Sequence, residues 1–175
     1  MQYEAMVKST NPVVSIDIKD HGTVKLQLFP NVAPNTVRNF IHLIKRGYYN
    51  GSPFHRVIEG FMIQGGAGPE TGCKIRGEFA ANGYTNDLKH GRGVISMART
   101  HDKNSATSQF FIVHRDAPHL DGEYAAFGGV FDGFSVIDKI ASTKTDANDK
   151  PLTAIVMTKV TVDTKEEAYE KPDCV

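Results

Sequence analysis

Short strand-type runs separated by glycine constrain the fold of this chain more than any other feature. Residues 13–18 (VVSIDI) and 24–29 (VKLQLF) alternate apolar and polar side chains, and Asp20 and Gly22 between them favour a turn, so this stretch predicts a β-hairpin. Similar runs occupy residues 54–58, 61–64, 93–98, 108–113, 125–131 and 155–162. Closing such strands into a barrel would remove their exposed edges. The pattern therefore predicts a mostly antiparallel β barrel.

Two other stretches have the three-to-four-residue period of an amphipathic helix. The first, residues 34–46, begins with Pro34 and is followed by Gly47, which suits a helix end. Its apolar positions are Val37, Phe40, Ile41 and Ile44. The second lies at 134–142. Because helical patterns are found only near the start and the end, an alternating βαβ layout is disfavoured.

The composition indicates one ordinary domain. A length of 175 residues with 40% hydrophobic and 23% charged residues suits a chain that buries a core without metal or disulfides. Twenty basic and twenty acidic residues cancel, so no net positive field attracts phosphate backbones or anionic lipid. The N-terminus lacks the apolar stretch of a signal peptide, and no run reaches the roughly 18 apolar residues of a membrane span. We therefore expect a cytoplasmic protein that binds neither nucleic acid nor membranes.

Cys73 and Cys174 are the only cysteines. A pair so sparse predicts neither a disulfide framework nor a zinc cluster, and it fits a reducing compartment. Residues 65–74 (GGAGPETGCK) are glycine-rich, but Cys73 stands where a phosphate-binding loop needs its lysine, so we expect a surface loop with an unreactive thiol. The seven histidines show no metal-ligand spacing, and we expect neither a metal site nor a cofactor.

The densest cluster of candidate site residues is 54–66 (FHRVIEGFMIQGG). A two-residue turn at 59–60 would place Arg56 on the opposite face of the hairpin from Met62, as an ordinary solvated residue. An odd-length loop would instead place Arg56 across from Gln64 and on one face with Met62. The spacing alone leaves both registers open.

A second candidate is the run 108–113 (SQFFIV), in which alternation places Gln109 and Phe111 on one face and Phe110 and Ile112 on the other. The ordinary inner and outer faces of a strand explain this pattern. A shallow apolar groove rimmed by hydrogen-bond donors, the general build of a peptide or small-ligand pocket, explains it equally well.

Taken together, residues 54–66, 93–98 (GVISMA), 108–113 and 119–133 (HLDGEYAAFGGVFDG) resemble the cyclophilin family of peptidyl-prolyl cis-trans isomerases in order and spacing. This resemblance implies a mainly β fold, a closed eight-stranded antiparallel barrel capped by two α-helices. It covers almost the whole chain.

The extent of the resemblance divides the chain into three parts. Residues 13–163 would form the cyclophilin-like isomerase domain, preceded by an N-terminal extension at 1–12 and followed by a charged tail at 164–175. We expect the tail to be loose.

The resemblance also implies the site, residue by residue. Arg56 would be the catalytic arginine. The substrate-binding residues would be Phe61, Met62, Gln64, Ala98, Arg99, Gln109, Phe111, His119, Leu120 and Tyr124. Apolar members would line a proline pocket, the two glutamines would bind polar groups of the substrate, and the backbone at 98–99 would hold the residue before proline.

Two departures from the family pattern resemble its bacterial branch. His119 lies where many eukaryotic members have tryptophan, and Tyr124 lies where they have histidine. Loss of the indole implies weak binding of cyclosporin, with isomerase activity retained. The stretch 99–111 (RTHDKNSATSQFF) is also one residue longer than the common family sequence, and the loop 66–74 differs from it.

The resemblance implies that the protein accelerates cis-trans rotation about Xaa-Pro bonds. Its substrates would be proline-containing peptides and folding proteins, and we expect it to act as a monomer. An arginine suits this chemistry because it stays charged and presents rigidly oriented donors to a twisted amide nitrogen. A non-catalytic proline-peptide binding module and a general chaperone are the alternatives. The presence of Arg56 favours catalysis.

Overall fold

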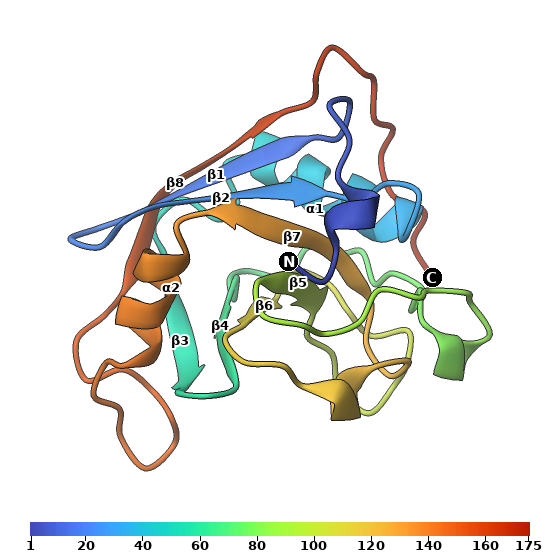
Figure 1. Cartoon of the computed structure of the whole chain (residues 1–175). Helices are drawn as coiled ribbons and strands as arrows, with labels where there is room; N and C mark the ends of the chain where they lie inside the picture. The colour runs from blue at the N-terminus through green and yellow to red at the C-terminus, as the bar shows by residue number, and fades with distance from the viewer.

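Eight β-strands form a closed antiparallel barrel in the computed structural model, which describes all 175 residues (Figure 1). Around the barrel the strands follow the order β1-β2-β7-β5-β6-β4-β3-β8. Their bounds are β1 Val13–Ile18, β2 Gly22–Leu28, β3 Ser52–Ile58, β4 Met62–Gly65, β5 Val94–Met97, β6 Phe110–Val113, β7 Ala126–Asp132 and β8 Val156–Asp163. Helix α1 (Pro34–Lys45) contacts β8, and helix α2 (Phe134–Ala141) contacts β2, β3 and β4. The expected mainly β barrel with two helices is confirmed, and none of the helices is long and apolar enough to cross a membrane.

Side-chain alternation explains how the strands build the core. In β1, Val14, Ile16 and Ile18 are buried while the residues between them are half-buried, so one face of the strand points into the barrel. Helix α1 contributes Phe40, whose ring lies 5.3 Å from that of Phe110 on β6 in an edge-to-face contact. The helical period of the sequence thus placed both helices to within one residue of their observed ends.

A second apolar cluster lies on the opposite face of β6. Phe110 belongs to the main core, whereas its neighbour Phe111 belongs to this second cluster. The N-terminal segment joins the cluster through Tyr3, whose ring packs 6.1 Å from that of Phe29 and whose hydroxyl donates to the carbonyl of Val130. Burial raises the pKa of Tyr3 to about 12. This cluster supports the site described below.

The C-terminal tail is docked, and a disulfide holds its end. Cys174 is bonded to Cys73, with 5.2 Å between the two Cα atoms. The amide of Asp173 donates to Oδ1 of Asn35 at 2.8 Å, and Nδ2 of Asn35 donates back to the Asp173 carbonyl at 2.9 Å. Figure 1 shows the tail running from β8 across the molecule to its C-terminus. The expectations of a loose tail and of a free thiol at Cys73 are therefore wrong, because folding brings together residues 101 positions apart.

Candidate functional site

The hairpin of β3 and β4 supplies the two polar residues at one edge of the site. Arg56 pairs with Gln64, and Ile58 pairs with Met62, so the connecting turn has three residues. Gly60 in this turn has φ of +80°, a conformation that favours glycine. Of the two registers that the sequence left open, the structure has the odd-length loop, which places Arg56, Gln64 and Met62 together.

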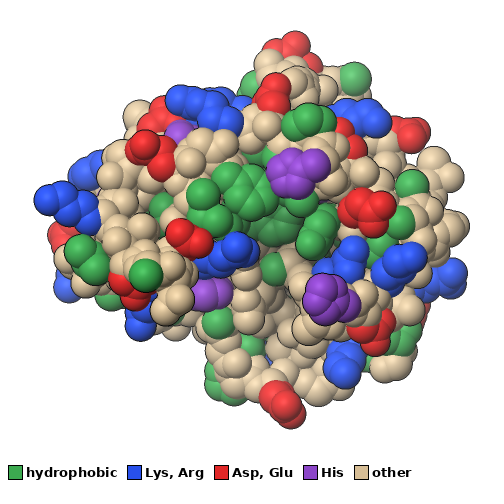
Figure 2. Space-filling model, turned by 90° about the horizontal axis from the view of Figure 1, so that it is seen from below, with side chains coloured by type: hydrophobic (Ala, Val, Ile, Leu, Met, Phe, Trp, Pro, Cys, Tyr) green, Lys and Arg blue, Asp and Glu red, His purple; other side chains and the backbone are tan.

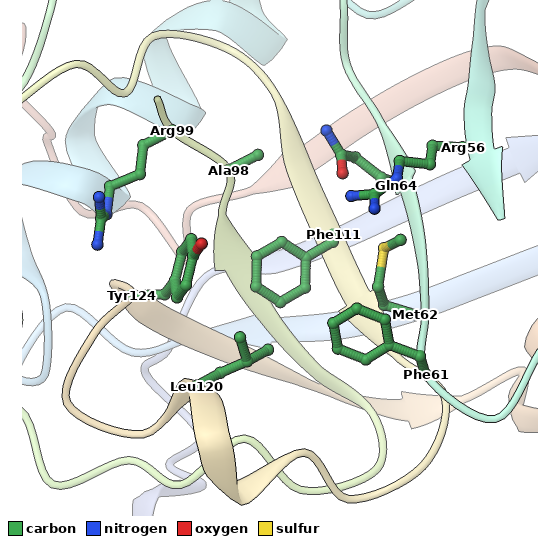
Figure 3. Close-up of a pocket in the computed structure, with 9 residues that line it drawn as sticks. All are labelled: Arg56, Phe61, Met62, Gln64, Ala98, Arg99, Phe111, Leu120 and Tyr124. Atoms are coloured by element: carbon green, nitrogen blue, oxygen red, sulfur yellow. The ribbon is translucent and has the colours of Figure 1, made fainter. Parts of the chain in front are cut away.

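One cavity of about 140 Å³ brings together most of the predicted site residues. It is lined by Arg56, Phe61, Met62, Gln64, Ala98, Arg99, Phe111, Leu120 and Tyr124 (Figure 3). Phe111 lies at the centre of the close-up between Met62 and Tyr124, and Arg56 lies at one edge beside Gln64. In Figure 2 apolar side chains gather in a hollow near the middle of this face, with basic side chains beside it. The result is a small apolar pocket with donors at its rim.

The guanidinium of Arg56 is available to a ligand. Arg56 is exposed and takes part in none of the seven ion pairs of the structure. Next to it, Nε2 of Gln64 donates to Oε1 of Gln109 at 3.0 Å, which fixes both amide groups at the pocket edge. The free donors of Arg56 therefore face an apolar cavity without an internal acceptor to satisfy them.

Arg99 holds the opposite wall. Its Cζ lies 4.9 Å from the ring centroid of Phe79 and 4.7 Å from that of Tyr124. Its Nε and one Nη donate to the carbonyl of Glu123 at 3.2 and 2.7 Å. The face of the guanidinium packs against the two rings while its N–H groups donate to the Glu123 carbonyl. Arg99 therefore fixes the orientation of Tyr124, which lines the cavity.

A second, polar pocket of about 260 Å³ continues from the first. The two share Gln64, Ala98 and Arg99, and the second is further lined by Thr100, Ser105, Thr107 and Gln109. Thr100, Ser105 and Thr107 come from the loop in which the sequence has one more residue than the family pattern, whereas Gln64 comes from β4. Sequence reasoning left the contacts of this loop open, and no local signal identified its hydroxyl groups as pocket residues.

The remaining predicted residues lie beside the cavity. Gln109 lines the polar pocket instead of the apolar one. His119 is exposed, with its ring 5.4 Å from that of Phe61 at the rim. No group of three or more His, Cys, Asp and Glu side chains is assembled anywhere in the structure in a form that could hold a metal ion.

Behind the pocket lies a buried histidine that the sequence did not identify. His90 is 1% exposed and stacks on Phe111 at 6.0 Å between ring centroids. Its Nδ1 is 3.0 Å from Oδ1 of Asp121, and its Nε2 is 2.9 Å from Oγ of Ser96. Burial lowers the pKa of His90, and the interaction with Asp121 offsets part of that effect. The neutral ring donates through Nδ1–H and accepts from the serine hydroxyl, which joins β5, β6 and the segment after Leu120.

Because the pKa of His90 is lower in the folded chain than in the unfolded one, acid should weaken the fold. The unfolded pKa is about 6.5, so this contribution to stability is complete above that pH and is lost as the pH falls through the folded value. A single proton gives a slope of at most about 1.4 kcal/mol per pH unit. We expect His90→Gln to have a smaller loss in the free energy of unfolding between pH 7 and 5 than the natural chain.

Urea unfolding at several pH values measures this slope. The pKa values of His42 and His55 are also lowered, chiefly by burial, and both residues remain in the variant, so some acid sensitivity should persist. His21→Gln, at a half-buried turn histidine whose ring makes only an exposed hydrogen bond, is the matched control and should keep the natural slope. If His90→Gln and the natural chain had equal slopes, His90 would not be a source of the loss of stability in acid.

Comparison with known proteins identifies the family of the chain. Residues 13–162 match the model described as cyclophilin type peptidyl-prolyl cis-trans isomerase. The chain is 41% identical to a peptidyl-prolyl cis-trans isomerase of Arabidopsis thaliana, over 81% of this chain and 90% of that protein. It is also 41% identical to peptidyl-prolyl cis-trans isomerase B of Escherichia coli, over 82% of this chain and 95% of that protein.

Comparison with solved structures leads to the same family. A cyclophilin type peptidyl-prolyl cis-trans isomerase of Cryptosporidium parvum superposes with a TM-score of 0.78 at 32% identity, covering 87% of this chain and 98% of that one. The same C. parvum protein was also solved in the presence of the dipeptide Ala-Pro. With the barrel, the hairpin register and the apolar cavity in place, the chain belongs to the cyclophilin-type peptidyl-prolyl cis-trans isomerases.

Proposed function

We propose that Arg56 is the catalytic residue of this isomerase and that the apolar cavity binds the proline ring. The observation that carries the proposal is the unpaired guanidinium at the rim of a pocket lined by Phe61, Met62, Phe111 and Leu120. A cavity of about 140 Å³ admits a small apolar ring and little more.

The chemistry follows from the amide bond. Rotation about a peptide bond has a barrier of about 18–20 kcal/mol because the nitrogen lone pair is delocalised into the carbonyl. In the twisted state this sharing is lost, and the nitrogen becomes pyramidal and able to accept a hydrogen bond. The Arg56 guanidinium donates to that nitrogen more strongly in the twisted state than in the planar one, which lowers the barrier without a nucleophile or proton transfer.

The rest of the site holds the substrate while the bond turns. The apolar cavity fixes the proline ring, and the amides of Gln64 and Gln109 bind the polar chain on the other side of the bond. Ala98 and Arg99 line both pockets, and their backbone binds the residue before proline. The substrates are proline-containing peptides and folding proteins, whose uncatalysed isomerisation takes tens to hundreds of seconds. Support comes from the related C. parvum protein solved with Ala-Pro.

The proposal also covers cyclosporin binding, the oligomeric state and the cellular compartment of the protein. His119 lies exposed beside Phe61, so cyclosporin meets an imidazole where many eukaryotic relatives offer an indole, and we expect weak binding. The monomeric state is an expectation that accompanies the family resemblance, and the cytoplasmic setting is an expectation from the sparse cysteines and the N-terminal sequence. The disulfide of Cys73 counts against a strongly reducing compartment, because disulfides persist mainly in oxidising ones.

Line-shape or exchange NMR on a short Xaa-Pro peptide tests the proposal with the natural chain. We expect the cis-trans exchange rate of the peptide to rise in proportion to protein concentration, with amide shifts confined to the two pockets. A folded chain that binds the peptide without accelerating exchange would instead be a docking module. Faster refolding of aggregation-prone clients without faster peptide exchange would indicate a general chaperone.

A further inference from the structure

The turn that carries Phe61 is held to the body of the barrel by one residue. Phe61 lines the apolar cavity and follows Gly60 in the turn between β3 and β4. The backbone amide of His114 donates to the carbonyl of Phe61 at 2.8 Å. The amide of Gly60 donates to Nδ1 of the His114 side chain at 2.9 Å. Two consecutive turn residues therefore bind the same histidine, which lies just after β6.

The hydrogen bonds around His114 determine which of its ring nitrogens carries the hydrogen. Because the Gly60 amide can only donate, Nδ1 of His114 must be the acceptor, and the ring proton is on Nε2. That Nε2 lies 3.0 Å from Oδ1 of Asp138 on α2, to which it donates. The His114 side chain is 6% exposed, so its ring nitrogens have little access to water and depend on these two partners.

Asp138 is itself fixed from the other side. The guanidinium of Arg92 binds it in a bidentate pair, with Nη1–Oδ1 at 2.7 Å and Nη2–Oδ2 at 2.9 Å. Hydrogen bonding from Arg92 is the main reason that the pKa of Asp138 is lowered, with a smaller effect from His114. A continuous chain of hydrogen bonds thus leads from α2 through His114 to Gly60 at the turn.

We propose that His114 is a positioning residue that holds the Phe61 wall of the proline pocket through the Gly60 amide. The proposal rests on the function proposed above, because it assigns the Phe61 side of the cavity to the proline ring. Without an acceptor at Nδ1, the part-buried Gly60 amide loses the hydrogen bond that ties the turn to the barrel, and the turn relaxes, which displaces Phe61. The proline ring occupies the pocket in both the planar and the twisted states, so the loss falls on KM and not on kcat.

Two substitutions distinguish the effects of the two hydrogen bonds that the His114 ring makes. In His114→Asn the side-chain Oδ1 takes the place of Nδ1 and can still accept from Gly60, while the bond to Asp138 is lost. In His114→Gln the side-chain Nε2 takes the place of the ring Nε2 and can still donate to Asp138, while the acceptor for Gly60 is lost. We expect His114→Gln to raise KM for an Xaa-Pro peptide about fivefold with kcat within about twofold, and His114→Asn to stay near natural values.

Hydrogen exchange of the Gly60 amide supplies a readout that a general loss of stability would not reproduce. It should accelerate in His114→Gln and remain slow in His114→Asn, with His21→Gln as the matched control at a histidine in a distant turn. Asp138→Ala replaces a side chain that is 44% exposed and is expected to fold. The imidazole then lacks the acceptor that keeps its proton on Nε2, so KM should rise by less than in His114→Gln, whereas Oδ1 of His114→Asn is an acceptor with or without Asp138.

Equal KM values and equal Gly60 exchange in the Gln and Asn variants would overturn the proposal. So would a KM change that merely follows the melting temperature across all variants. If His114→Gln fails to fold, an unchanged KM in Asp138→Ala overturns it. Peptide dissociation constants from NMR titration keep the two proposals apart: a natural chain without isomerase activity defeats the proposed function, whereas weaker peptide binding in His114→Gln would still support the role of His114.

Discussion

Replacing Arg56 with alanine is expected to lower kcat/KM for an Xaa-Pro peptide by about 10²–10³-fold, the usual effect of removing one donor to a developing lone pair or charge. The guanidinium has no ion-pair partner in the fold, so the variant should keep its stability within about 0.5 kcal/mol. Most of the loss should fall on kcat, because the bond to nitrogen strengthens only as the amide twists.

The variant Arg56→Lys distinguishes the effect of the positive charge from that of the oriented hydrogen-bond donors. Lysine keeps the charge but replaces a planar, rigid set of donors with one flexible ammonium group, so we expect at least about a tenfold loss of kcat/KM. Arg46→Lys, at an exposed arginine following α1, is the matched control and should be fully active. Exchange NMR gives the rate and circular dichroism confirms the fold. If Arg56→Lys retained natural activity, charge alone would suffice and the oriented hydrogen bond would be the wrong explanation.

Reducing the Cys73–Cys174 disulfide is expected to destabilise the protein strongly. The bond joins residues 101 positions apart, and closing a loop of about 100 residues stabilises a fold by about 4.7 kcal/mol in the chain-entropy model. In a chain of this length that corresponds to a fall of about 10–20 °C in melting temperature. After reduction the tail keeps the packing of half-buried Tyr169 against the core and exposed polar contacts such as that of Asp173 with Arg38.

Thermal unfolding with and without dithiothreitol measures this effect, and Cys174→Ser supplies the control. The variant should melt at the temperature of the reduced natural chain and should not respond to dithiothreitol. Neither cysteine lines the two pockets, so peptide isomerisation at 25 °C should be unchanged by reduction. A melting temperature that is the same in oxidised and reduced protein would show that the disulfide contributes nothing to the stability of the fold.

Local patterns in the sequence determined the secondary structure of this protein. Alternation predicted the strands, including β1 at Val13–Ile18, and a period of three to four predicted α1 and α2. These signals are readable because each depends on residues only two to four positions apart. The pattern of short strands also predicted an antiparallel barrel. The resemblance of the motifs to a known family then added its eight-stranded closure and the set of predicted site residues, nine of which line one cavity.

Tertiary structure alone decided which distant groups meet. The Arg56–Gln64 register depended on a three-residue turn that spacing did not distinguish from a two-residue one. His90 meets Asp121 across 31 positions, His114 meets Gly60 across 54, and the two cysteines meet across 101. Local periodicity in the sequence cannot predict such contacts, because they depend on how the strands and loops of the closed barrel pack together. The sequence determines the elements through local preferences, whereas contacts between them arise only when burial of the whole core selects one arrangement.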